Sequence, residues 1–199
     1  MENQLEQLKS TLESKGYSVR VFDTLAEAAD YLDSVIDNKT VGIGGSGTVL
    51  KSGLYEMLQK HNEVHWHWKS EDQDSERYAG MTADVYLTSV NAITENGEMV
   101  NLDGKGNRVA AMLFGPKKIV YMIGKNKIVK DIPAAMDRVR NYCGPERAKQ
   151  LNRKTPCIKD GKCHDCNSPE RICNGMNILF RPMSGSDVEI LLIDETLGI

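Results

Sequence analysis

The chain has 199 residues, which is enough for one domain to bury a hydrophobic core without help from disulfides or metal. Its 25 Lys and Arg balance 28 Asp and Glu to a net charge of -3, which excludes a global positive field for nucleic acid or anionic lipid. No signal-peptide pattern and no run long enough to span a membrane occurs, so we expect a cytoplasmic protein without a membrane segment.

The first third of the sequence alternates helical and extended patterns. Leu5, Leu8 and Leu12 have helical spacing and end before Gly16, and a strand is predicted over 18–22. Thr24 and Glu27 have the spacing of a capping box ahead of a helix over 25–36. A buried strand over 40–45 then runs into glycines, and a helix is predicted over 49–60.

The same alternation continues to the C-terminus. We predict strands over 63–68, 84–90, 117–124, 176–182 and 187–194, and helices over 70–80, 107–115 and 133–143. Asn96-Gly97 within 92–102 is typical of a β-hairpin. Strands that alternate with helices favour a mostly parallel sheet covered on both faces, with this hairpin grafted onto it.

A glycine-rich loop lies between the strand at 40–45 and the helix that follows. Its backbone N-H groups and the positive end of the helix are suited to an anion, although the loop matches neither the dinucleotide fingerprint nor a P-loop. The alternative is a tight turn that serves helix packing only. In an open α/β sheet ligands bind beyond the carboxyl ends of the strands. The candidate ligand residues here are Gly44, Gly45, Ser46, Gly47 and Thr48.

A second set of polar residues falls in turns between 84 and 127. Capping and loop bracing explain any one of them, but their collective placement favours a site. The ligand-binding candidates of this set are Asn91, Thr94, Asp103, Asn107 and Arg108. The available candidates for a catalytic base are Glu95 and Asp103.

Three stretches carry a resemblance to a known family. They are VGIGGSGT, SVNAITENGEMVNLDGKGNRVAAMLFGPKKIVYMIGKNKIV, and the C-terminal TPC, GKCHDC and SPERICN segments. In these stretches the chain closely resembles the LUD-domain family, named for lactate utilization and typified by lactate utilization protein C. The resemblance spans nearly the full chain, so we expect one LUD domain over 1–199 that includes a Cys-rich segment over 155–175.

The resemblance implies a fold like that of NagB, ribose phosphate isomerases (RpiA) and coenzyme A transferases. It also implies a role in organic-acid utilization, with iron-sulfur proteins of a lactate-oxidizing system as partners. VGIGGSGT stands where the isomerases hold phosphate. The acidic pair of their second loop is replaced by Asn91 and Ala92, which argues against an isomerase mechanism.

Four cysteines, Cys157, Cys163, Cys166 and Cys173, follow a C-x5-C-x2-C-x6-C pattern. Four thiolates suit zinc or an iron-sulfur cluster, and the spacing does not choose between them. Nearby lysines and Arg171 would offset thiolate charge. A reversible disulfide and unrelated free thiols are the alternatives. Cys143 is interpreted as a partly buried thiol before a helix-stopping Gly-Pro.

His65 and His67 share one face of the strand predicted over 63–68. We interpret this strand as half-exposed, with an aromatic core face, and assign neither histidine to a site.

The leading hypothesis is a protein that binds a small anionic metabolite at the glycine loop and a metal or cluster at the cysteines. One alternative is a stand-alone isomerase or acyl-transferase-type enzyme. Another is a regulatory module with a structural zinc, although no aromatic platform for nucleic acid accompanies the cysteines. The sequence leaves a homo-oligomer open.

Overall fold

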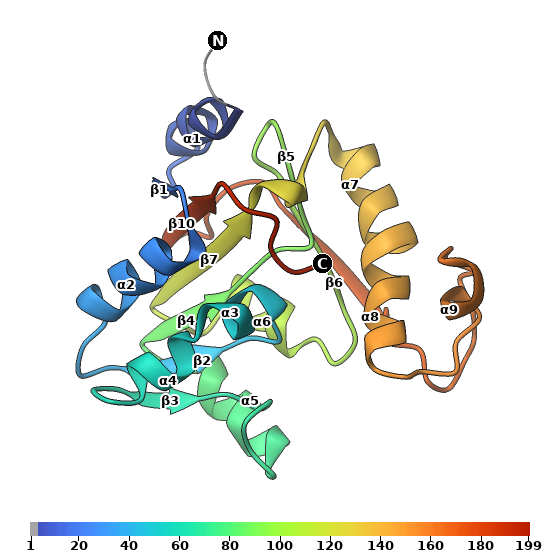
Figure 1. Ribbon diagram of the computed structural model, residues 1–199, viewed down its shortest axis with the longest axis horizontal. Helices are drawn as coiled ribbons and strands as arrows, with labels where there is room; N and C mark the ends of the chain where they lie inside the picture. Colours follow the sequence, from blue (N-terminus) through green and yellow to red (C-terminus); the bar gives the residue numbers. More distant parts are fainter. Residues whose placement is uncertain (1–3) are drawn as a thin grey trace.

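The computed structural model describes residues 4–199, and Figure 1 shows their arrangement. The helices are α1 (Gln4–Ser14), α2 (Leu25–Val35), α3 (Gly47–Ser52), α4 (Leu54–Leu58), α5 (Gln73–Met81), α6 (Asn107–Leu113), 3-10 helix η1 (Lys125–Lys127), α7 (Ile132–Arg138), π-helix η2 (Val139–Cys143), α8 (Gly144–Gln150) and α9 (Cys157–Asp160). The strands are β1 (Ser18–Phe22), β2 (Thr40–Ile43), β3 (Glu63–His65), β4 (Val85–Thr88), β5 (Ala92–Thr94), β6 (Met99–Asp103), β7 (Lys118–Gly124), β8 (Ile128–Val129), β9 (Gly175–Leu179) and β10 (Asp187–Ile193).

A six-stranded sheet in the order β1-β10-β7-β4-β2-β3 forms the centre of the molecule, and every pairing in it is parallel. Alternate residues of the central strand β7 face opposite cores. Val120 and Met122 pack against α2, α3 and α4, whereas Ile119, Tyr121 and Ile123 pack against α1, α6 and the hairpin. The predicted α/β fold with a mostly parallel, helix-covered sheet is confirmed.

The predicted hairpin is present, with Gly97 at a φ of 84°, but it belongs to a second sheet. The order of this sheet is β8-β5-β6-β9, so the segment predicted as a strand over 176–182 pairs antiparallel with β6 outside the central sheet. One face of the second sheet adds to the core around β7. Its other face packs on α7 and η2 through Ala92 and Val100.

The longest helical run differs most from prediction. It continues from Ile132 through Gly144-Pro145 to Gln150, so the expected stop at Gly-Pro is wrong. A π turn over Val139–Cys143 allows this, since the N-H of Gly144 bonds to Val139 O, five residues back. Proline has no backbone N-H, so it is tolerated where the regular pattern of helical hydrogen bonds is already interrupted.

Two other predicted elements are shorter than expected. The helix predicted over 49–60 divides at Gly53, whose φ of 73° is left-handed. The strand predicted over 63–68 ends at His65, and the chain turns there to bury Trp66. His67 is also buried, so the interpretation of this stretch as half-exposed is wrong for His67.

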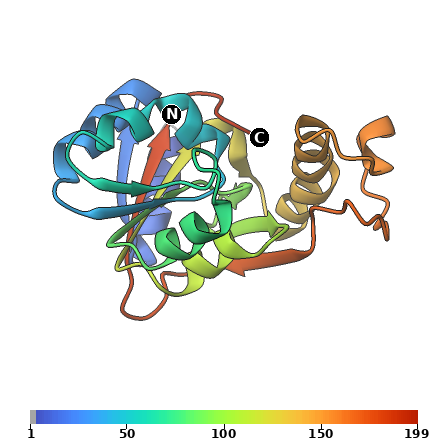
Figure 2. The same cartoon turned by 90° about the horizontal axis from the view of Figure 1, so that it is seen from below.

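Residues 132–174, which comprise α7, η2, α8, α9 and the cysteine segment, are named the arm. Figure 2 shows the arm projecting from the α/β body, with α9 and the cysteine segment at its outer end. None of the helices in residues 4–199 combines the length and the apolar character that a bilayer span requires.

Candidate functional site

The carboxyl ends of three neighbouring strands form the candidate site. Strands β7, β4 and β2 are adjacent and parallel, so the segments that follow them meet at one edge of the sheet. These segments are Lys125–Lys127, residues 89–91 and the glycine loop. The sequence predicted ligand-binding loops at this edge of the sheet, and in the structure hydrogen bonds join these loops.

The glycine loop is shaped by close packing. A Cβ on Gly44 would lie 2.9 Å from both Thr88 Oγ1 and Tyr86 Oη and 3.4 Å from Arg108 Cγ, so this position needs glycine. A Cβ on Gly45 would contact Trp68 at 3.4 Å. A tight approach of backbone to side chains therefore accounts for both glycines.

Ser46 and Thr48 have different roles in this loop. Ser46 is buried and caps α3 by accepting the N-H of Val49 at 3.2 Å. Helix α3 has only six residues, so its dipole adds little to anion binding. Thr48 is fully buried, and its Oγ1 lies 3.2 Å from Lys127 Nζ. Gly47 packs against Gly198, where a Cβ would lie 3.9 Å from Gly198 Cα.

Lys127 is the feature that sequence reasoning missed. It is 3% exposed, and among the described residues its ammonium donates only to hydroxyls, to Ser89 Oγ at 2.8 Å and to Thr48 Oγ1. Burial, and next the charges of Arg108 and Arg138, lower the pKa of Lys127 to about 7. The sequence has no local signal for this burial, because Lys125 in the same turn is exposed.

Arg108 holds the second loop together. Its Nη1 donates to Ser89 O at 3.1 Å and to Asn101 Oδ1 at 3.0 Å, and its Nη2 donates to Asn91 Oδ1 and Leu102 O, both at 2.8 Å. Arg108 as a whole is 8% exposed. Arg108 therefore spans from the end of β4 to β6.

Asn91 connects Arg108 to the arm. Its carbonyl accepts Arg138 Nε at 3.1 Å and the thiol of Cys143 at 3.6 Å, while its side chain accepts from Arg108 and from Leu102 N. Burial raises the pKa of Cys143, and the positive charges of Arg138 and Lys127 act in the opposite direction. Cys143 is 2% exposed, which is more buried than the partly buried thiol predicted, and it lies beside the site rather than at a helix end.

The cluster of Arg108, Lys127 and Arg138 has an excess of positive charge. Within residues 4–199, no carboxylate oxygen lies within 4.0 Å of a charged nitrogen of these three side chains. Two buried donors nearby, Arg138 Nη2 and Asn101 Nδ2, have no hydrogen-bond partner in the part of the chain that the structure describes. Buried cations and unsatisfied donors are costly unless an acceptor is supplied. The cluster therefore has the charge and donors to receive an oxyanion.

The remaining candidates of the second loop lie at varied places. Asp103 accepts Gly104 N at 2.8 Å and Val109 N at 3.2 Å, which braces the turn into α6. Asn107 is the half-buried first residue of α6. Thr94 bonds within the hairpin turn to Glu98, and Glu95 contacts Gln4 there through its side chain. Thr94 and Glu95 thus make contacts in the hairpin and not in the cation cluster.

His67 lies beside the glycine loop, where a Cβ on Gly45 would be 3.7 Å from its Nε2. Burial, and next the charge of Arg77, lower its pKa to about 4, with Asp103 acting in the opposite direction. Above that pH the imidazole is neutral. The guanidinium carbon of Arg147, in the arm, lies 4.9 Å from the centroid of the Trp68 ring. This side of the glycine loop therefore also contacts the arm.

The four cysteines gather around a separate pocket in the arm. A pocket of about 330 Å³ is lined by Cys157, Cys163, Cys166 and Cys173 together with Arg140 and residues of η2, α8 and β9. All four are reduced and half-buried. Across residues 4–199, no group of three or more His, Cys, Asp or Glu side chains is already close enough to hold one metal ion.

Basic side chains order this pocket. Arg140 Nη2 lies 3.6 Å from Cys163 Sγ, and Arg171 donates to Cys166 O at 2.8 Å and to Cys173 O at 3.1 Å. One face of the helical run, at Arg140 and Gly144, lines the thiol pocket, while Arg138 and Cys143 of the same run contact Asn91. One helix therefore separates the pocket from the cation cluster.

Comparisons with known proteins agree with this architecture. The family model described as the LUD domain matches residues 5–193. A crystal structure of a DUF162 family protein from Deinococcus radiodurans superposes with a TM-score of 0.55 at 14% identity and covers 96% of each chain, which supports the fold. No curated protein matches the chain. With a family match over nearly its whole length and the expected sheet beneath its glycine loop, the chain belongs to the LUD-domain family.

Proposed function

We propose that this LUD-domain protein binds a small organic acid through its carboxylate at the cluster of Arg108, Lys127 and Arg138. The observation that carries the proposal is a set of three neighbouring cations at the carboxyl ends of β4 and β7 that have no carboxylate partner among residues 4–199. A bound carboxylate would offset the cost of burying Lys127 and would accept from Arg138 Nη2. Family membership makes an acid of lactate utilization, such as lactate or pyruvate, the ligand to test first.

Isothermal titration calorimetry with L-lactate, pyruvate, phosphate and a coenzyme A thioester tests this proposal at pH 6.5. We expect one-to-one binding of a carboxylic acid that Lys127→Met abolishes. Lys125→Met is the matched control, because Lys125 lies in the same turn but is half exposed and paired with Asp194 at 3.0 Å. Binding of phosphate or the thioester alone would favour a transferase-type ligand instead.

We further propose that the four cysteines of the arm hold an iron-sulfur cluster. All four cysteines line one pocket, so four thiolates are available to a single cluster. The thiolate donor set and the Arg140 contact to Cys163 fit a cluster, whose ligand sulfurs accept hydrogen bonds. A cluster would supply one-electron chemistry beside the organic-acid site.

Anaerobic purification followed by iron, sulfide and zinc analysis tests the cluster. We expect iron and sulfide in equal amounts with a visible chromophore, and loss of both in Cys163→Ser/Cys166→Ser. Cys143→Ser, outside the pocket, should keep them. Stoichiometric zinc without iron would replace the cluster with a structural site.

A further inference from the structure

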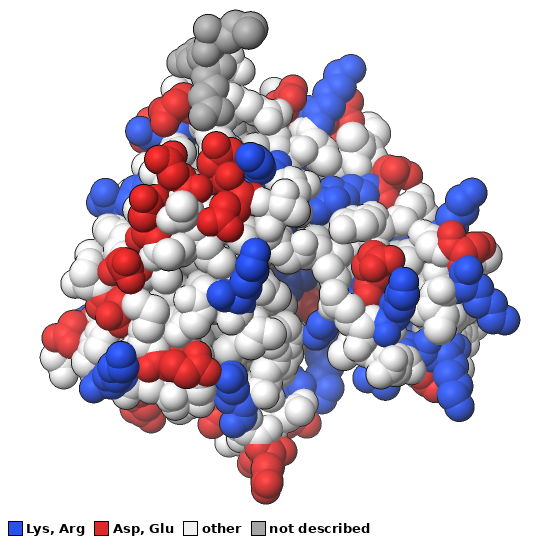
Figure 3. Space-filling model, in the orientation of Figure 1, with Lys and Arg blue, Asp and Glu red and all other residues white. Residues whose placement is uncertain are grey.

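The charge of the chain is unevenly divided between the arm and the body. Residues 132–174 contain nine Lys and Arg against five Asp and Glu, a net charge of +4. The rest of the chain contains sixteen against twenty-three, a net charge of -7. The balanced overall charge thus conceals a basic arm on an acidic body, and Figure 3 shows red side chains crowded on the body and blue ones along the outer edge of the arm.

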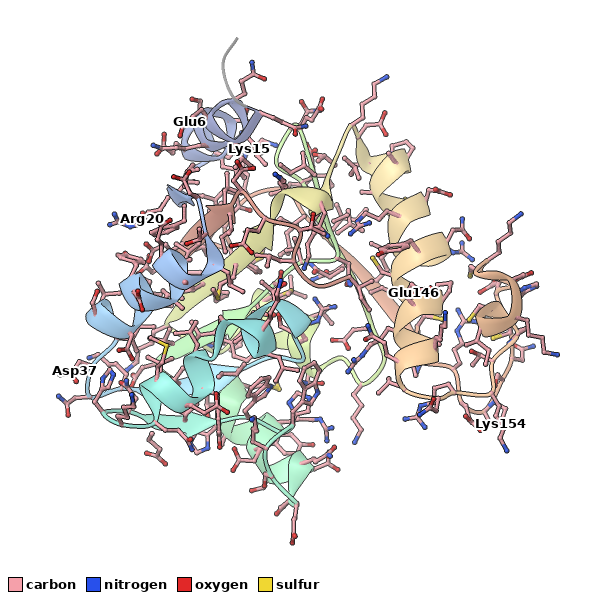
Figure 4. The ribbon with its side chains drawn as sticks, in the orientation of Figure 1. Glu6, Lys15, Arg20, Asp37, Glu146 and Lys154 are labelled. Atoms are coloured by element: carbon pink, nitrogen blue, oxygen red, sulfur yellow. The ribbon has the colours of Figure 1, made fainter. Side chains whose placement is uncertain are left out.

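Among the Lys and Arg side chains of the arm, only Arg140 and Arg171 form ion pairs within residues 4–199, both with Asp165. Five of them are exposed and form no ion pair within the described residues: Lys149, Arg153, Lys154, Lys159 and Lys162. By contrast, nine Lys and Arg of the body form ion pairs, such as Lys69 with Glu56 at 2.8 Å. Lys154 lies in the loop at the outer end of the arm (Figure 4). The arm therefore presents positive charge that the fold itself does not use.

Apolar side chains are exposed among these cations. Leu151 is 39% exposed and Ile158 37%, and they flank the segment that leads into the thiol pocket. Exposed apolar side chains beside charged ones suit contact with another protein, because protein interfaces bury apolar area and keep charge at their rim. The arm contains one Tyr, no Phe and no Trp, so it offers little surface on which to stack the successive bases of a single strand. A protein with a negative surface fits this composition better than nucleic acid.

We propose that the arm is the docking surface for an acidic redox protein, which covers the thiol pocket with its negative face. The redox character of the partner rests on the proposed iron-sulfur cluster, whereas the acidic character rests on the unpaired cations alone. Docking there places the partner against the wall of the pocket that contains Cys157 and Cys163. Opposite charges would steer the encounter and make it sensitive to salt.

Fluorescence anisotropy of a labelled acidic [2Fe-2S] ferredoxin, titrated with the full chain, tests the docking surface. A labelled 20-nucleotide single-stranded DNA serves as the competing probe. We expect the ferredoxin to bind, with affinity that falls as salt rises, and Lys149→Glu/Arg153→Glu to weaken binding about tenfold or more. Lys39→Glu/Lys60→Glu makes the same change of charge at exposed lysines of the body and should have little effect.

Each other outcome has a defined meaning. No binding of ferredoxin, binding that both double variants weaken equally, or equal binding of ferredoxin and DNA would overturn the proposal. Tighter binding of DNA that depends on the arm would assign the surface to nucleic acid. Metal analysis of the same samples separates the proposal of an iron-sulfur cluster from that of a docking surface. Arm-dependent binding of ferredoxin to metal-free protein would contradict the cluster and support the docking surface.

Discussion

Replacing Lys127 with methionine should make the unliganded protein more stable while removing its ligand site. The methionine keeps the apolar stem of the side chain and removes a buried ammonium that has only hydroxyl partners. We expect a gain of several kcal/mol in the free energy of unfolding at pH 6, because the cost of burying the charge disappears.

The pH dependence of stability gives a sharper form of the same prediction. The pKa of Lys127 is about 7 in the folded protein, against 10.5 for an ordinary lysine side chain. Between these values the unfolded chain binds the additional proton, so stability rises with pH across that window. From pH 7 to pH 9 the rise is about 2–3 kcal/mol, from two pH units at about 1.4 kcal/mol each. Below pH 7 the full penalty is present.

Urea unfolding of the wild type and of Lys127→Met at pH 6, 7, 8 and 9 measures this effect. Both proteins contain the same histidines and cysteines, so the difference between their curves isolates Lys127. We expect the advantage of the variant to shrink from pH 7 to pH 9. An advantage that is constant with pH, or a variant that is less stable throughout, would refute a buried charge at this position.

Three further predictions follow from individual contacts. Binding of an organic acid by the wild type should weaken as pH rises from 7 to 9, because Lys127 loses its proton. Calorimetry in buffers of different ionization enthalpy should show proton uptake on binding at pH 8. Proton uptake that is unchanged in Lys127→Met would assign the proton to another group. Gly42→Ala should destabilise the fold by several kcal/mol in urea unfolding, since the new Cβ would lie 2.2 Å from the Gly80 carbonyl oxygen. Gly175→Ala serves as the control, because the space around Gly175 is open. Arg138→Gln should raise the Kd for the acid about tenfold or more without lowering the midpoint of thermal unfolding by more than a few degrees, and an unchanged Kd would remove Arg138 from the site.

Local sequence patterns were sufficient for most of the fold. The leucines of α1, the capping box at Thr24 and the Asn-Gly hairpin each act over a few residues, and each forms as predicted. The second sheet was not predictable in this way, because the pairing of β9 with β6 joins residues about 75 positions apart. The π turn also has no local signal, and without it Gly144-Pro145 indicates a helix end.

The candidate site was predicted in outline but not in its charges. Parallel strands fix where the loops meet, so the glycine loop, Asn91 and Arg108 were found from topology and turn chemistry. Lys127 and Arg138 looked like ordinary surface residues, since only tertiary packing buries the first and brings the second to the carbonyl of Asn91. Periodicity reports which face of an element is apolar, and it does not report the burial of a charge in a turn.

Calorimetric titration of pyruvate and L-lactate into the wild type and into Lys127→Met at pH 6.5 tests whether the buried cations bind a carboxylate. We expect one carboxylic acid bound per chain by the wild type, no detectable binding to Lys127→Met, and wild-type binding by Lys125→Met. Equal binding by the wild type and Lys127→Met would contradict a carboxylate site at the buried cations.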